Sequence, residues 1–195
     1  MIQEHKIFPT LILEIPDFLN KNECKKIEKS LNLKKNKSFL KAHPALPEKA
    51  LSSHTNEGFY NLINFLDKSF KDNLLKFTKK YADSSGFEIF NVINNSWFNI
   101  QKKGSTLNNH THPVSVLSGV VYLKVDNDSS PVYFFNPNPM IDFTAIGPPT
   151  EYSYECYYFK PQLGTLLLFP SWLKHGSNQV MNKSNERISI SFNVT

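Results

Sequence analysis

The segment that decides the fold runs from Gly164 to His175 and reads Gly-Thr-Leu-Leu-Leu-Phe-Pro-Ser-Trp-Leu-Lys-His. Its short apolar run is bounded by Gly and Pro, a pattern typical of a buried strand. Pro170 and Ser171 predict a turn directly after this strand. The segment therefore predicts a strand inside a sheet, with a histidine held just beyond its end.

Short strands of the same kind fill the chain after Gly86. They are apolar, aromatic and β-branched runs separated by Gly, Pro, Asn and Asp, with no helical pattern between them. The predicted strands cover residues 87–93, 96–102, 116–125, 131–135, 152–159, 165–169 and 187–194. Such a succession favours a sandwich or a closed barrel. The proline-rich loop at 135–152 is long for a compact domain, and we expect it to border the substrate or form a lid.

The chain before Gly86 has a helical pattern instead. Asn20 followed by Glu23 is a capping-box start for a helix that continues to about Leu31. Apolar residues recur at three- and four-residue steps across 59–81, which predicts one long helix lying against a sheet.

Length and composition agree with one globular domain. The chain has 195 residues, of which 40% are hydrophobic and 20% charged. We expect an α+β, mainly β domain in which residues 1–86 form a helical buttress and residues 87–195 the β-core.

Composition also narrows the setting of the protein. No apolar run reaches the roughly 18 to 20 residues that span a bilayer, and the N-terminus lacks the layout of a signal peptide. Cys24 and Cys156 have neither disulfide-framework nor metal-binding spacing, so we expect free thiols and a cytoplasmic protein. The net charge is +5, and lysines crowd the stretch 21–41. Without interleaved aromatics, this stretch is expected to be a solvated face rather than a nucleic-acid site.

Two histidines, His110 and His112, lie just ahead of the predicted strand at 116–125. On extended backbone, alternate residues point to the same side, so the two imidazoles are expected to converge. In a closed barrel a late strand can lie beside an early one, which would bring His175 to them. Three imidazole nitrogens can hold a divalent metal and leave coordination positions open. The alternative is that the pair arises by chance and the rings are hydrogen-bonded structural groups.

The last predicted strand has one polar and one apolar face. Alternation separates Arg187, Ser189, Ser191 and Asn193 from Ile188, Ile190 and Phe192. An unpaired guanidinium inside a barrel is costly, and a dicarboxylic ligand would satisfy it, with Arg187 giving a bidentate fork and Ser189 a hydroxyl. The alternative is an arginine that faces solvent or pairs with an acid.

The order of these elements forms a pattern. It runs His110-x-His112, Ser118-Gly-Val-Val-Tyr122, Pro161-x-x-Gly164-x-x-Leu167-Leu-Phe-Pro-Ser-Trp-Leu-x-His175, then Arg187-x-Ser189. It resembles the 2-oxoglutarate/Fe(II)-dependent oxygenases, and more closely a microbial and phage subgroup with the same H-x-H. The resemblance covers about residues 87–195 and implies a double-stranded β-helix, a jelly roll of the cupin-like type.

The resemblance also implies a site and a reaction. The implied iron ligands are His110, His112 and His175. The implied 2-oxoglutarate contacts are Arg187 and Ser189, with Tyr122 and Asn99 matching inner-strand contacts in approximate position. With O2, the family converts 2-oxoglutarate to succinate and CO2 and forms an iron(IV)-oxo that hydroxylates a substrate.

One feature departs from the family pattern. The usual ligand set is two histidines and one carboxylate, whereas His112 stands at the carboxylate position, which makes its ligation less secure than that of His110 and His175. A third neutral ligand would leave the metal with one more unit of positive charge.

Two other functions fit parts of the sequence. Gly104 ahead of His110-x-His112 fits the start of a cupin metal-site pattern, but the glutamate that this pattern requires is missing. A non-enzymatic β-sandwich with incidental or zinc-binding histidines is the other alternative. The sequence leaves open whether the substrate is a protein, a nucleic acid or a small molecule, and whether the chain forms a homodimer.

Overall fold

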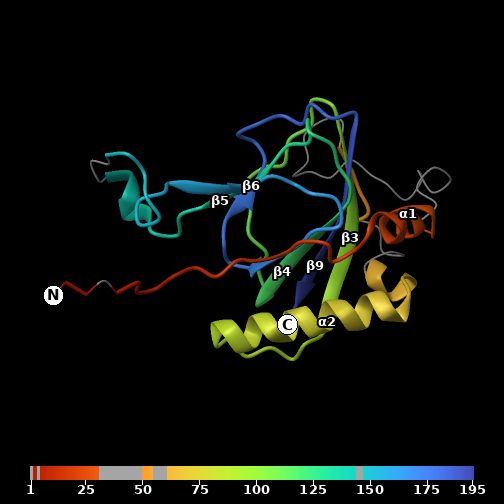
Figure 1. Cartoon of the computed structure of the whole chain (residues 1–195), viewed down its shortest axis with the longest axis horizontal. Helices are drawn as coiled ribbons and strands as arrows, with labels where there is room; N and C mark the ends of the chain where they lie inside the picture. Colours follow the sequence, from red (N-terminus) through yellow and green to blue (C-terminus); the bar gives the residue numbers. More distant parts are fainter. Residues whose placement is uncertain (1, 4, 31–49, 55–60, 144–146) are drawn as a thin grey trace.

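The large sheet of the protein is six-stranded and antiparallel throughout (Figure 1). The computed structural model describes residues 2–3, 5–30, 50–54, 61–143 and 147–195. The strands of this sheet, in spatial order, are β1 (Leu13–Ile15), β7 (Leu166–Pro170), β4 (Leu117–Lys124), β9 (Glu186–Val194), β3 (Ile93–Lys102) and β2 (Ala50–Ser52).

A second, three-stranded sheet completes the jelly roll. Its strands, in order, are β6 (Cys156–Phe159), β5 (Val132–Phe135) and β8 (His175–Gly176). The chain leaves β7 in the large sheet, turns at Pro170, and enters β8 in the small one. This architecture confirms the predicted double-stranded β-helix.

Strand alternation divides the interior into two apolar clusters. On β4, Val121 packs toward α2 (Lys68–Ser85) in the larger cluster, whereas Val120 and Tyr122 face the small sheet in the other. On β9, Ile188 and its alternate neighbours likewise face the helix. Each strand of the large sheet therefore has one face in a conventional core and one face turned toward the small sheet.

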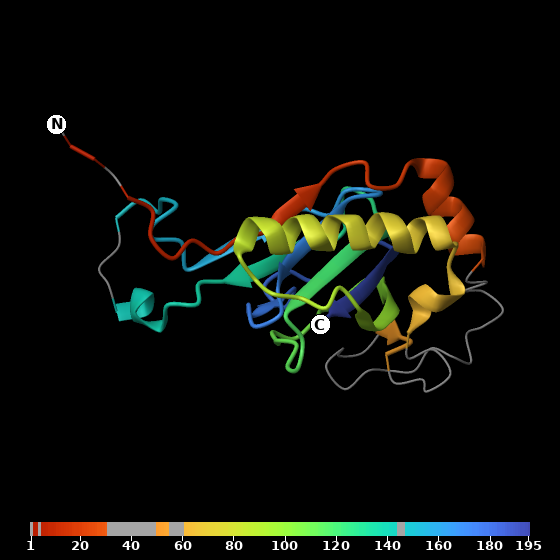
Figure 2. The same cartoon turned by 90° about the horizontal axis from the view of Figure 1, so that it is seen from below.

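Helix α2 covers the outer face of the large sheet, crossing its strands (Figure 2). Its buried residues Phe70, Leu74 and Tyr81 join the larger cluster. The helix ends at Gly86, which adopts a left-handed φ of 73° and donates its N–H to Ala82. The predicted change from helix to strand near Gly86 thus corresponds to a helix end.

The predicted helix across 59–81 was too long. Residues 55–60 lie outside the described part, Leu62–Phe65 form the 3-10 turn η3, and Leu66 is extended before α2 begins. Leu62 and Ile63 are buried although they are not part of α2. The three- and four-residue spacing therefore marked buried positions correctly but merged two elements.

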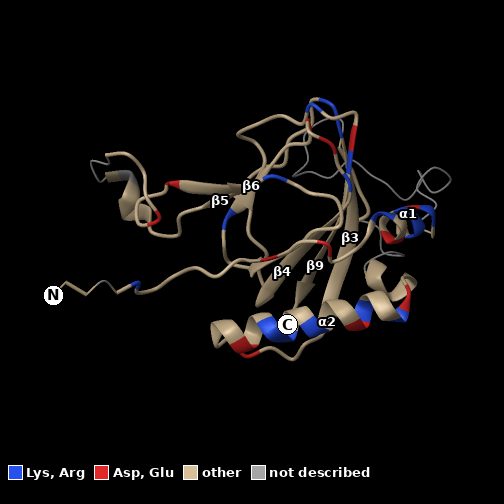
Figure 3. Ribbon diagram, viewed as in Figure 1, with Lys and Arg blue, Asp and Glu red and all other residues tan. Residues whose placement is uncertain are grey.

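The first helix, α1 (Lys21–Ser30), begins as predicted. The side-chain oxygen of Asn20 accepts from the N–H groups of Asn22 and Glu23 at 2.9 and 3.1 Å, and the Asn20 N–H donates to the Glu23 carboxylate at 2.8 Å. The lysines of α1 alternate with acids, and both signs of charge occur along α2 as well (Figure 3). The lysines at 34, 35, 37 and 41 lie outside the described residues.

Two predicted strands are shorter in the structure. Of residues 87–93 only Ile93 is in a strand, because Asn91 takes a left-handed φ of 56° and its side chain bonds to Thr78 and Leu75 of α2. Of residues 152–159 only β6 is extended. The strands at 96–102, 116–125, 131–135, 165–169 and 187–194 are confirmed with small changes at their ends. The edge strands β1 and β2 and the two-residue β8 were not predicted.

The loop that precedes β6 continues the β5–β6 hairpin away from the two sheets (Figures 1 and 2). It contains a short 3-10 helix, η4 (Pro139–Phe143), and Met140 and Phe143 are exposed there. Within the described residues, no helix has the length and apolar character required to cross a membrane.

A close backbone approach fixes the rim of the β-helix. His110 and His175 exchange two backbone hydrogen bonds of 2.9 and 3.0 Å in an antiparallel bridge. Gly176 follows directly, and a Cβ added there would meet the Asn109 side-chain oxygen at 2.4 Å and the Leu107 carbonyl at 2.9 Å. Only glycine lets the segment before His110 lie this close to β8.

Replacing Gly176 with alanine should therefore push the 107–110 segment away from β8. We expect Gly176→Ala to lower the free energy of unfolding by about 1 to 3 kcal/mol, the scale of overpacking, and to weaken Ni(II) binding measured by calorimetry. Gly147→Ala is the matched control, because an added Cβ at Gly147 meets nothing within 4 Å. Unchanged stability and unchanged Ni(II) binding in Gly176→Ala would contradict the role given to this approach.

Candidate metal and co-substrate site

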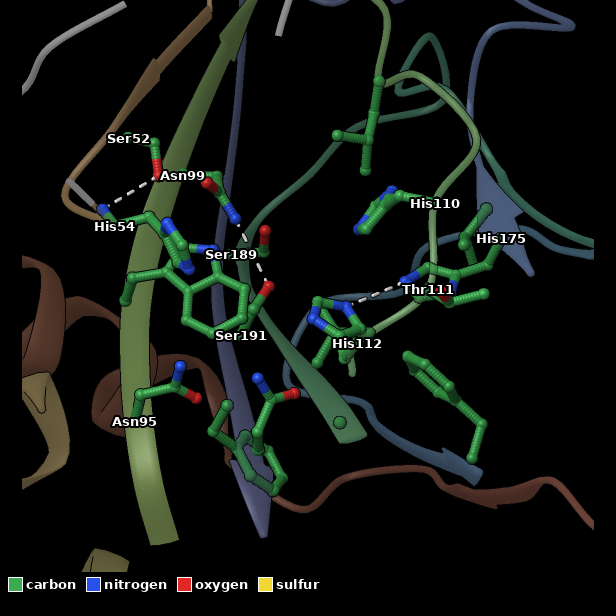
Figure 4. Close-up of a pocket in the computed structure, with 18 of the residues that line it drawn as sticks. Ser52, His54, Asn95, Asn99, His110, Thr111, His112, His175, Ser189 and Ser191 are labelled. Atoms are coloured by element: carbon green, nitrogen blue, oxygen red, sulfur yellow. Dashed lines mark hydrogen bonds between the residues drawn. The ribbon is translucent and has the colours of Figure 1, made fainter. Parts of the chain in front are cut away.

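Three imidazoles from two distant segments meet at the rim of the β-helix (Figure 4). Ring centroids lie 4.9 Å apart for His110 and His112, 4.4 Å for His110 and His175, and 5.1 Å for His112 and His175. One nitrogen of each ring lies within 4.8 Å of the others. The convergence predicted from the sequence is therefore present in the structure.

Backbone carbonyls set the tautomers of two of the rings. Nδ1 of His110 lies 2.8 Å from the Asn108 carbonyl, and Nδ1 of His175 lies 2.8 Å from the Leu173 carbonyl. A carbonyl only accepts, so each Nδ1 carries the proton and each Nε2 is unprotonated. Hydrogen bonds of this kind typically orient metal-binding histidines.

The spacing of two of the ring nitrogens fits a shared metal. Nε2 of His112 lies 3.2 Å from Nε2 of His175. Two nitrogens each about 2.1 Å from one metal, at a right angle, are about 3 Å apart. Without a metal, the tautomer of His112 that carries the proton on Nε2 donates to His175; a metal bound at Nε2 would require the other neutral tautomer, with the proton on Nδ1.

The surroundings keep these rings neutral. Burial, together with the smaller effect of the neighbouring imidazoles, lowers the pKa of His112 to about 2 and that of His175 to about 3. Neutral imidazole is the form that binds metals, so neither ring has to lose an imidazolium proton at neutral pH.

The rings open onto a cavity of about 440 Å³. This volume lies in the range of small-molecule sites in proteins. The floor consists of alternate side chains of β3 and β9, and Tyr122 of β4 also lines it. Among the described residues that line it, Arg187 is the one charged group and there is no carboxylate.

Arg187 lies at one end of this cavity with its charge uncompensated. The side chain is buried, and none of the ion pairs among the described residues includes it. Its guanidinium carbon lies 5.0 Å from the centre of the Tyr122 ring, and one guanidinium nitrogen donates to the side-chain oxygen of Gln101. A buried cation without a counter-ion is costly, so the cavity favours an anionic ligand at this end.

Unpaired hydrogen-bonding groups mark the same end. The Tyr122 hydroxyl, Nε of Arg187 and the side-chain nitrogen of Gln101 are buried and have no hydrogen-bond partner within the described part of the chain. Burial raises the pKa of Tyr122, so its hydroxyl stays protonated and can donate. The donors present suit a carboxylate, which has only acceptors.

Ser189 and Asn99 lie opposite one another on the cavity floor. They are register partners on β9 and β3, and the Asn99 side chain donates to the Ser191 hydroxyl at 3.2 Å (Figure 4). Both line the cavity, as do Arg187 and Tyr122. All four residues expected around the co-substrate are thus brought together.

Some cavity residues were not expected from the sequence, among them Gln101, Trp97 and His54. Gln101 contacts Arg187, and the Trp97 ring lies between His54, at 4.6 Å, and His112, at 5.6 Å. Alternation on the predicted strand at 96–102 places Trp97 and Gln101 on the same face as Asn99, which was the available signal. For His54 there was none, because it belongs to a short segment that joins the sheet through long-range pairing.

Comparison with known proteins places this chain in a family. Residues 95–193, just over half of the chain, match the family described as "Putative 2OG-Fe(II) oxygenase". No curated protein is significantly similar to the chain in sequence.

Solved structures share the fold at low sequence identity. An oxidoreductase of the 2OG-Fe(II) oxygenase family from Burkholderia pseudomallei is 14% identical with a TM-score of 0.59, covering 93% of this chain and 82% of that one. A prolyl-4-hydroxylase from Pseudomonas putida is 12% identical with a TM-score of 0.57, covering 95% and 94%. HygX from Streptomyces hygroscopicus, solved with nickel and 2-oxoglutarate, is 13% identical with a TM-score of 0.58, covering 94% and 82%.

The family match spans the strands and loops that carry all three histidines and Arg187, and it decides against the cupin and non-enzymatic alternatives. The chain belongs to the 2-oxoglutarate- and iron(II)-dependent oxygenase family.

Proposed function

We propose that the protein is a 2-oxoglutarate-dependent hydroxylase whose iron(II) is held by His110, His112 and His175. One observation carries this proposal. A cluster of three imidazoles and a buried guanidinium without a counter-ion line one cavity of about 440 Å³. A metal ion would bind to the imidazoles, and a dicarboxylate would neutralise the guanidinium. The family's description names both Fe(II) and 2-oxoglutarate.

The protein's own groups have separate tasks in this proposal. Arg187 and Ser189 bind the distal carboxylate of 2-oxoglutarate, with the Tyr122 hydroxyl as a further donor. Asn99 lies between this end and the imidazoles and orients the bound chain. Iron supplies the activation of O2 that couples conversion of 2-oxoglutarate to succinate and CO2 with substrate oxidation.

His112 makes the proposed centre more electropositive than one with a carboxylate ligand. The three imidazoles are neutral donors, and no acid lies among the described cavity residues. The bound metal therefore keeps its full double charge, which strengthens its hold on the anionic co-substrate. This assigns His112 a role that the usual carboxylate cannot fill.

The cavity also limits the substrate. Once Arg187 is engaged by a carboxylate, the described lining offers only neutral groups, among them His54, Asn95 and Trp97. A charged group entering there would lose its hydration without gaining a counter-ion. We therefore infer that the reacting part of the substrate is uncharged.

Two free thiols, Cys24 and Cys156, support our prediction of a cytoplasmic protein. A homodimer remains compatible with the chain.

The proposed function is tested by succinate formation. Purified protein with added Fe(II), ascorbate and 2-oxoglutarate, alone or with a screen of uncharged substrates, should form succinate, because the proposed reaction converts 2-oxoglutarate to succinate and CO2. Omitting Fe(II) or replacing it with Zn(II) should abolish the product. Equal succinate with and without Fe(II), or none under all conditions including a screen of uncharged substrates, would contradict the proposal.

Removing the most buried imidazole should remove the metal. His175→Ala deletes the Nε2 that lies 3.2 Å from His112, and we expect iron content by elemental analysis to fall from about one per chain to background. The matched control is His5→Ala, because His5 is exposed and far along the chain from the cluster. Stoichiometric iron in His175→Ala would exclude His175 as a ligand.

Removing the buried guanidinium should weaken the binding of 2-oxoglutarate and leave the binding of the metal unchanged. We expect Arg187→Ala to reduce 2-oxoglutarate affinity by about 2 to 4 kcal/mol, the scale for truncating one partner of a buried charge pair. Calorimetry on the Ni(II)-loaded protein measures this change without requiring turnover. Lys183→Ala, at an exposed position near the start of β9, is the control. If Arg187→Ala binds 2-oxoglutarate as tightly as the wild type, the distal carboxylate lies elsewhere.

A further inference from the structure

We propose that Gln101 is a positioning residue that aims the Arg187 guanidinium and, by being neutral, reserves its charge for the distal carboxylate of the co-substrate. The inference rests on the proposed function and adds to it a residue that sets selectivity for 2-oxo dicarboxylates.

Gln101 and Arg187 are held face to face by the sheet. They are register partners on β3 and β9, and their exposed fractions are only 2% and 6%. The backbone of Gln101 is fixed in turn by the Asn182 side chain, whose nitrogen donates to the Gln101 backbone carbonyl at 3.2 Å. The glutamine is therefore a rigid part of the floor rather than a mobile surface group.

The chemistry of the contact fixes the orientation of the amide. A guanidinium has only donors, so the side-chain oxygen of Gln101 must face Arg187, and that oxygen accepts from one guanidinium nitrogen. The amide nitrogen is then left without a partner among the described residues, as are Nε of Arg187 and the Tyr122 hydroxyl. Gln101 thus binds one nitrogen of the guanidinium. Nε of Arg187, the Gln101 side-chain nitrogen and the Tyr122 hydroxyl are left to donate to a ligand in the cavity.

Glutamate has nearly the same shape as glutamine, so the two residues would differ at position 101 mainly in charge. A glutamate would form a buried ion pair with Arg187 and cancel its charge, whereas glutamine accepts the same hydrogen bond and leaves the charge intact. The nearest acid along β9 is also occupied, because Glu186 pairs with Lys124 at 2.6 Å. Arg187 thus keeps a full charge that no described side chain neutralises.

Selectivity follows from this arrangement. A 2-oxo acid with a distal carboxylate gains the interaction with Arg187, whereas 2-oxopentanoate, which has the same chain length and no distal carboxylate, gains nothing from it. Gln101 should therefore control the preference for 2-oxoglutarate over 2-oxopentanoate, and leave the affinity for 2-oxopentanoate unchanged.

The test uses calorimetry on the full Ni(II)-loaded chain with both 2-oxo acids. We expect Gln101→Glu to weaken 2-oxoglutarate binding by about a hundredfold and Gln101→Met, which keeps the size and loses the hydrogen bond, by about tenfold. Binding of 2-oxopentanoate should change little in either variant. Gln162→Glu adds the same charge at an exposed position and should behave as the wild type.

The outcomes separate this inference from the proposed function. If the wild type binds Ni(II) but no 2-oxoglutarate, the proposed function fails. If the wild type binds 2-oxoglutarate and Gln101→Glu binds it equally well, or loses both 2-oxo acids to the same extent, the role of Gln101 is wrong. Should Gln101→Glu fail to fold, judged by its unfolding transition, Gln101→Met alone decides by the same criterion.

Discussion

The site depends on one short piece of backbone pairing, the two hydrogen bonds between His110 and His175. These residues are 65 positions apart, and the bridge brings the H-x-H segment against the end of the small sheet. Because hydrogen bonds fix the backbone on both sides, the rings are aimed before any metal arrives. Such preorganisation lowers the entropic cost of assembling a metal site.

The cavity beneath this bridge is organised by charge. Three imidazoles and one buried cation line it, and no described lining residue is acidic. The arrangement favours an anionic ligand, since among the described residues Arg187 has no counter-ion and several buried donors have no acceptor. The imidazole cluster and the guanidinium together define the ligand that suits the cavity. It is an anion whose carboxylate groups can reach both the imidazoles and Arg187.

The sequence predicted what local patterns determine. Alternation in 187–194 identified both faces of β9, and the Asn20 capping box identified the start of α1. Patterns could not predict features that depend on distant partners. The edge strands β1 and β2 have three residues each, too few to show alternation, and exist only because the large sheet offers them an edge. In the site, alternation places Gln101 on the same face as Asn99, but only the pairing of β3 with β9 shows that it lies beside Arg187.

In the proposed function, three imidazoles and one guanidinium serve a single metal and co-substrate pair. The most direct measurement is a crystal structure of the protein with Mn(II) and 2-oxoglutarate, using anomalous scattering to locate the metal. We expect one anomalous peak within bonding distance of the Nε2 atoms of His110, His112 and His175, with the distal carboxylate at Arg187. A peak bound by only one of these rings, or a co-substrate that leaves Arg187 untouched, would contradict the proposed function.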